Sequence, residues 1–363
     1  MKVAELKQKI EPYKAAQLRR LVVEMYKAMP KSLKQGKGID ELICNPASGR
    51  KKQEAETPID MGFLSWEVEQ FLDDAYNQYY FAPNSVIPKR ERPKWRFIAL
   101  RLFKQLNQAA ADPHNVAEAS KLLEQLYGML CYSCQYVLFN SDDPFQSVGI
   151  AQPDFLHAVL RARRQVESES SRDFVRNSIF VALGHSLNGN APDEQLMEVV
   201  IGFLTTPDLK QLAIAGCDEI RRSIEKDGLP RLDAGHWQDD SHSDYRKKRM
   251  LQSLGKMGFM CHMALFEPGE AVDYFLRHSA EKDPEIRLYV LLRMIQHYGN
   301  EQLWMKVYEQ ALKNCVRPRP ELKELYEKFR READQPSSSM SSIDGPQCPA
   351  TLLGAATEAG DPK

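Results

Sequence analysis

The stretch EIRLYVLLRMIQHYG, residues 285–299, decides the fold that we expect, because three other segments repeat its pattern. These segments are FVRNSIFVALGHSLNG from Phe174, DLKQLAIAGCDEI from Asp208 and YRKKRMLQSLGKMG from Tyr245. A first column of aligned positions, spaced by 34, 37 and 40 residues, consists of Val175, Leu209, Arg246 and Ile286. A second column follows eight residues later and consists of Leu183, Cys217, Leu254 and Met294. All of these residues except Arg246 are apolar, and a period of this length is typical of a stacked repeat.

Each unit of the repeat is predicted to be a pair of helices. Shorter helical patterns lie between the repeated segments, at 193–206 and 269–282, and tight turns containing proline precede Leu209 and Ile286. Proline suits the first helical position, because its fixed φ matches the helix and its missing amide donor is not needed there. One helix pair cannot bury its apolar face alone, whereas stacked pairs share a continuous core. We therefore expect an α-solenoid of antiparallel helix pairs over 150–333. Its core positions should include Val175, Leu183, Leu209, Ile286 and Met294.

The repeated pattern resembles HEAT-type repeats. In these, an Asp-Pro turn leads into an inner helix that carries an aliphatic–Arg pair and a later Leu-Gly. The matching residues here are DPEIR at 283–287, VALG at 181–184 and SLGKMG at 253–258, so the resemblance covers about 171–315. It implies a curved solenoid with a concave face. A fold of this kind carries no activity of its own.

The rest of the chain also indicates an all-α protein. Helical periodicity is clear at 14–29 and 63–80, and no alternating strand pattern occurs. We expect an N-terminal helical block over 1–140, with a loop at 45–62 and a connection at 140–154. Residues 334–363 are rich in Ser, Pro, Gly and Ala, which predicts a disordered tail.

A second resemblance concerns residues 14–106. LRRLVVEMYKAMP and YYFAPNSVIPKRERPKWRF look like segments of a family of uncharacterised bacterial helical proteins, a domain of unknown function. Membership would imply a bacterial origin and nothing about chemistry.

Composition favours a cytoplasmic protein. The formal net charge is −1, so bulk charge predicts neither nucleic-acid nor membrane binding. The seven cysteines are scattered, which indicates reduced thiols in a reducing compartment. The first residues are charged throughout, so we expect no signal peptide. No apolar run is long enough to cross a bilayer, and we expect no membrane partner.

The basic stretch at 86–106 is the one candidate binding site. It carries seven basic residues and one acid, and its possible anion-binding residues are Lys89, Arg90, Arg92, Lys94 and Arg96. Cations at a helix start oppose the helix dipole, so either an external phosphate or nearby acids should balance them. The acids that we favour as internal partners are those of the preceding helix, Glu67, Glu69, Asp73 and Asp74. Trp95 lies on the apolar arc of this helix and is predicted to be core.

Four further motifs are weighed against ordinary structural roles. CYSC at 131–134 lacks a second ligand pair for zinc and lies in a helix, which favours core thiols. His236, Asp240, His242 and Asp244, within 233–244, could bind a divalent metal, although a polar loop explains them better. GHSLN at 184–188 misses the last glycine of a nucleophile elbow and follows a helix. DYRKKRM at 244–250 is flanked by acids, which favours a solvated face over nucleic-acid contact.

These observations predict a non-catalytic helical-repeat scaffold that mediates protein–protein binding on its concave face. The alternative is a nucleic-acid or phosphate-binding repeat protein that uses residues 89–96. We expect no catalytic residues, no cofactor and no metal site. The sequence leaves the partner and the oligomeric state open.

Overall fold

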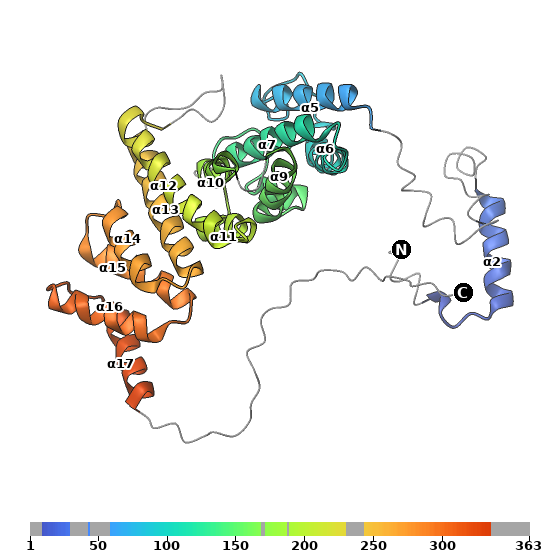
Figure 1. Cartoon of the computed structure of the whole chain (residues 1–363). Coiled ribbons are helices and arrows are strands. Elements are labelled where there is room, and N and C mark those ends of the chain that lie inside the picture. The colour runs from blue at the N-terminus through green and yellow to red at the C-terminus, as the bar shows by residue number, and fades with distance from the viewer. Residues whose placement is uncertain are drawn as a thin grey trace, which may run out of the picture. The chain divides into compact units, whose positions relative to one another are not determined.

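The structure is a computed structural model that describes residues 9–29, 43, 59–167, 171–186, 189–229 and 243–334. Within these residues every regular element is a helix and there is no strand, which confirms the all-α prediction (Figure 1). No helix among them is both long and apolar enough to cross a membrane. The predicted tail at 335–363 and nearly all of the loop at 45–62 lie outside the described residues.

The chain divides into two units, Met1–Leu64 and Ser65–Lys363, and each is described here by itself. The main helix of the first unit is α2 (Ala15–Ala28), in agreement with the periodicity at 14–29. Its apolar side chains are exposed: Leu21, Val22, Val23 and Met25. The helix is therefore amphipathic, with an apolar face that the described residues do not bury.

The second unit begins within α5 (Met61–Tyr76), which the unit boundary crosses. The next helices are η2 (Arg92–Lys94), α6 (Trp95–Ala109), α7 (Val116–Ser133), α8 (Pro144–Val148) and α9 (Gln152–Val166). An aromatic cluster holds their first part together, because Phe139 stacks on Trp95 at 3.9 Å between ring centroids and also contacts Phe71 and Tyr80. Trp95 is 4% exposed, so its predicted place in the core is confirmed.

No break in packing occurs near residues 140–150, where the sequence suggested that one block ends and the next begins. α7 packs against α9, and it also contacts α10 (Arg172–Ser186). The helices on either side of the connection therefore belong to one packed body.

The remaining helices are α11 (Asp193–Phe203), α12 (Pro207–Asp227), α13 (Ser243–Ala264), α14 (Pro268–His278), α15 (Pro284–His297), α16 (Glu301–Lys313) and α17 (Pro320–Asp334). Prolines start α12 and α15 as the sequence predicted. Side chains just before them cap the free amides: the Thr206 hydroxyl accepts from the amide of Leu209, and the Asp283 carboxylate accepts from that of Ile286.

Three of these helices, α12, α13 and α14, pack side by side (Figure 1). Gly258 of α13 lies against the ring of Tyr274 of α14, and a Cβ atom at this position would fall inside that ring. Gly255, one turn earlier, faces the carbonyl of His278, and its Cβ would lie 3.3 Å from that oxygen. The small residues of SLGKMG therefore let the two helices approach closely.

One predicted core position is wrong. Val175, Leu183, Leu209 and Met294 are buried, but Ile286 is 41% exposed. The buried face of α15 is instead formed by Leu288, Leu291, Leu292, Met294 and Ile295. Ile286 lies in the first turn, on the helix face that continues to Tyr289 and Arg293, so the aligned column does not mark the core of α15.

The two repeated segments at Val175 and Leu209 pack against each other as α10 and α12. Arg172 at the start of α10 pairs with Glu219 of α12, and Arg176 and Ile179 face Gly216.

Candidate functional site

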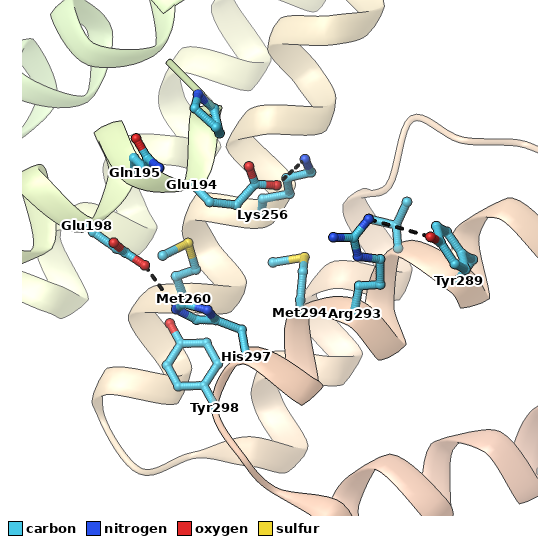
Figure 2. A pocket seen from close by; sticks show the side chains of 12 residues that line it. Glu194, Gln195, Glu198, Lys256, Met260, Tyr289, Arg293, Met294, His297 and Tyr298 are labelled. Carbon is cyan, nitrogen blue, oxygen red and sulfur yellow. Dashed lines mark hydrogen bonds and ion pairs between the residues drawn. The ribbon is translucent and has the colours of Figure 1, made fainter. Parts of the chain in front are cut away.

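A cavity of about 590 Å³ lies between α11, α13 and α15 and is the candidate site (Figure 2). We call it the groove. Its lining residues are Pro192, Glu194, Gln195, Glu198, Lys256, Met260, Tyr289, Val290, Arg293, Met294, His297 and Tyr298. They come from segments up to about a hundred positions apart in the sequence, which only the fold brings together.

The start of α11 is fixed on α13 by polar contacts. The carboxylate of Asp193 accepts hydrogen bonds from the Ser253 hydroxyl at 2.7 Å and from the Arg249 guanidinium at 3.3 Å. These bonds place the next residue, Glu194, beside Lys256. One wall of the groove is therefore held by contacts that lie outside it.

Two methionines form the apolar centre of the groove. Met260 and Met294 are almost fully buried, and they lie between Glu198 on one side and Arg293 on the other (Figure 2). Val290 adds a half-buried aliphatic side chain. Methionine is flexible and polarizable, so a surface built on it adapts to different apolar partners.

Charged pairs line the rim of the groove. The Lys256 ammonium donates to the Glu194 carboxylate at 2.7 Å, and His297 Nε2 lies 2.9 Å from the Glu198 carboxylate. Burial on its own would raise the pKa of Glu194. The hydrogen bond from Lys256 and the charges of Lys256 and Arg293 outweigh burial and hold that pKa below its ordinary value. Glu194 is therefore ionised at neutral pH, as a partner of Lys256 and not as a proton donor.

Arg293 differs from the other cation of the groove because no carboxylate of the described residues pairs with it. Its guanidinium lies 5.8 Å from the ring centroid of Tyr289 and 3.5 Å from the hydroxyl of that residue. On the other side, burial, followed by the charges of Cys261 and Glu198, raises the pKa of Tyr298 to about 12, so its hydroxyl keeps its proton. The groove thus offers one exposed cation without a carboxylate partner and two tyrosine hydroxyls around an apolar centre.

The titratable groups of the groove are engaged with one another. Its two carboxylates are engaged by Lys256 and His297, and no serine or cysteine belongs to its lining. In the described part of the chain, no three His, Cys, Asp or Glu side chains gather as a metal site would require. An apolar side chain with a polar group beside it would find complementary contacts here.

The five basic residues singled out in the sequence lie around η2 and the start of α6. Arg90 and Lys94 both pair with Glu91, and Arg92 donates to the backbone carbonyls of Ile87 and Asn84. The hydrogen bond from Lys94 is the main cause that lowers the pKa of Glu91. Three of the five cations therefore have partners inside the stretch itself.

The acids predicted to balance this cluster are the wrong ones. Glu67 binds Arg101 through two hydrogen bonds of 2.6 and 2.7 Å, while Asp74 and Asp73 accept from Gln70 and Asn77 of their own segment. The neutralising acid is Glu91, which lies three residues before Lys94 and shares one helical turn with it.

The other two cations, Lys89 and Arg96, are exposed and have no ion pair with a described residue. The Arg96 guanidinium lies over the ring of Phe97 at 4.9 Å. A second cavity of about 360 Å³ opens beside Phe97 and is bordered by Lys94 and Arg101. The anion-binding role predicted for the five residues stays a prediction.

Two of the other sequence motifs, CYSC and DYRKKRM, lie in or at the end of helices of the fold. Cys131 is buried, and burial raises the pKa of Cys134 to about 12, so Cys134 is a protonated thiol. Lys248 pairs with Glu281 at 3.1 Å, so one cation of DYRKKRM is neutralised within the fold. His236, Asp240 and His242 lie outside the described residues, as do the last two residues of GHSLN.

Sequence reasoning missed the groove. Arg293 and His297 are four residues apart and therefore share a face of α15. This spacing was the local feature of the sequence that could have indicated a polar site on that helix. Their partners on α11 and α13 could not be assigned without the fold. In comparisons with known proteins, the chain matched no protein-family model, no curated protein and no solved structure.

Proposed function

We propose that this protein is a non-catalytic helical scaffold that binds a segment of another protein in the groove between α11, α13 and α15. The observation that carries the proposal is the composition of the groove: a buried methionine centre surrounded by charges that are mostly paired within the protein. The exposed guanidinium of Arg293, which has no carboxylate partner among the described residues, stays available for a polar contact with the ligand.

The size of the groove supports a peptide ligand. A volume of about 590 Å³ lies within the usual range of roughly 300–1,000 Å³ for ligand sites and accommodates a few side chains. Its polar groups come from three helices, and residues on helices hold their geometry better than residues on loops.

The HEAT-like stacking of helix pairs is part of the same proposal. It is supported by the unbroken series of packed neighbours from α12 to α17 and by the proline-led, capped starts of α12 and α15.

A random dodecapeptide library selected against the full chain tests the proposal. We expect enriched peptides whose affinity falls at least about tenfold when Val290→Lys places a charge in the groove, because a buried cation without a partner is costly. Leu312→Lys on α16, at a side chain that is 45% exposed, is the matched control and should leave affinity unchanged. Failure to enrich peptides, or equal effects of the two variants, would rule out the groove as the binding surface.

A further inference from the structure

The second cavity, beside the basic stretch, has the composition of a docking site. Its apolar walls are Tyr80, Ile87, Phe97 and Ile98. With a volume of about 360 Å³ it accommodates one or two side chains. Val86, next to Ile87, is 62% exposed, and Phe97 is 60% exposed. An apolar surface of this kind, beside a cavity and rimmed by polar residues, is typical of an interaction site.

The two cations that line this cavity are neutralised, but cations without an acidic partner lie near its lining residues in the sequence. Lys94 has Glu91 and Arg101 has Glu67. Lys89, Arg96 and Lys104 are exposed and have no acidic partner among the described residues. They flank the cavity along the sequence, and Lys104 lies seven positions after Phe97, on the same face of α6. The apolar cavity therefore adjoins a stretch that carries uncompensated cations, of which Arg96 contacts the lining residue Phe97.

We propose that this cavity docks a second segment of a partner protein, one in which an apolar side chain is flanked by Asp or Glu residues. The apolar side chain fills the space between Ile87, Phe97 and Ile98, and the acids meet Lys89, Arg96 and Lys104. This site is separate from the groove and goes beyond the function proposed for it.

A protein segment fits this surface better than a nucleic acid does. Single-stranded nucleic acids bind by stacking bases on open aromatic faces above a basic track. Here the guanidinium of Arg96 already lies over one face of Phe97, and two of the cavity walls are aliphatic, Ile87 and Ile98. Aliphatic walls favour an apolar side chain over a flat base.

Fluorescence anisotropy on the full chain tests the inference with defined probes. The probes are labelled dodecapeptides that carry glutamates around one central residue, which is Phe, Leu, Met or Ser, and a twelve-nucleotide oligothymidylate. We expect at least one of the three apolar peptides to bind at least about tenfold more tightly than the serine peptide, and binding to weaken as salt rises. Tighter binding of the oligothymidylate, equal binding of the serine peptide, or no binding of any peptide would overturn the proposal.

Matched variants locate the binding. Phe97→Ser and the double variant Lys89→Gln, Arg96→Gln should each weaken the preferred peptide about tenfold. Their controls are Val137→Ser, at a side chain 51% exposed, and Lys313→Gln with Lys323→Gln, which removes the same charge from exposed positions. Loss of binding in the controls to the same extent would show that the peptide does not use this cavity. All of these side chains are exposed, so folding is preserved.

Discussion

At the scale of single residues, buried polar side chains connect distant parts of the fold. Gln152 is 3% exposed at the start of α9. Its amide nitrogen donates to the Tyr127 hydroxyl at 3.2 Å, and its amide oxygen accepts from the backbone amides of Asn190 and Ala191 at 2.9 and 2.8 Å. One side chain thus fixes the backbone that leads into α11, the first wall of the groove.

Gln152→Leu should lower the free energy of unfolding by about 1–3 kcal/mol, because it removes the hydrogen bonds of a buried side chain with the Tyr127 hydroxyl and with the backbone amides of Asn190 and Ala191. Urea titration measures this loss. Gln296→Leu, at an exposed position of α15, should change the free energy by less than about 0.5 kcal/mol. Equal values for the two variants would show that the Gln152 network contributes nothing specific.

His278 should make stability depend on pH. Burial, followed by the charge of Arg221, lowers its pKa below the ordinary value of 6.5, although the Asp218 carboxylate 3.8 Å away opposes this. Below pH 6.5 the unfolded chain takes up a proton that the folded chain resists, so the contribution of His278 is complete above pH 6.5 and falls as pH drops toward its folded pKa. Urea unfolding of the natural chain and of His278→Gln at pH 8 to pH 5.5 should show a smaller loss in the variant. Parallel curves would contradict this.

At the scale of elements, α15 shows that the periodicity of the sequence predicts a helix but does not predict which face of the helix is buried. The proline start and the helix itself follow from local chemistry and were predicted correctly, whereas the capping role of Asp283 is seen only in the structure. The orientation of the helix depends on its neighbours. Ile286 was assigned to the core because it aligns with Val175 and Leu209, whereas the packing of α15 buries Leu291 and Leu292.

Ile286→Asp should therefore cost less than about 1 kcal/mol, because an exposed side chain is replaced by an acid that suits the first turn of a helix. Leu291→Asp, at a fully buried position of the same helix, should cost several kcal/mol because it buries an unpaired carboxylate. Thermal unfolding compares the two variants. Severe destabilisation by Ile286→Asp would show that Ile286 is a core residue, as its alignment with Val175 and Leu209 predicted.

The candidate sites were predictable to different degrees for the same physical reason. The basic stretch is contiguous, so its charges were visible in the sequence. Its acidic partner was predicted on the preceding helix, whereas the structure pairs two of its cations with Glu91, inside the stretch itself. The groove joins Glu198 to His297 across the fold. No local rule of spacing connects residues that far apart in the sequence.

At the scale of the whole molecule, the described helices from α5 to α17 form the larger packed body, and the apolar face of α2 is exposed in the smaller unit. Stability should therefore reside in residues 59–334. The composition of 335–363, rich in Ser, Pro, Gly and Ala, predicts that this segment buries little apolar surface.

A chain of residues 59–334 should keep the melting temperature of the full chain within about two degrees, because the exposed apolar face of α2 and the composition of 335–363 predict little stabilisation of the helical body by the removed segments. Differential scanning calorimetry of both chains at equal concentration measures this. A decrease of many degrees would show that residues 1–58 or 335–363 stabilise the helical body, and removing them one at a time would identify which.

The contact of Gly258 with Tyr274 has a consequence for the gene that encodes the protein. Tyr274 cannot swing aside easily, because it is buried and its hydroxyl donates to the Asp218 carboxylate at 2.7 Å. Every single-nucleotide missense change in a glycine codon introduces a residue with a Cβ atom, which at this position meets the tyrosine ring. We therefore expect this codon to tolerate only synonymous changes. In a library that carries all amino acids at position 258 and is selected for folded protein, nearly every surviving clone should encode glycine.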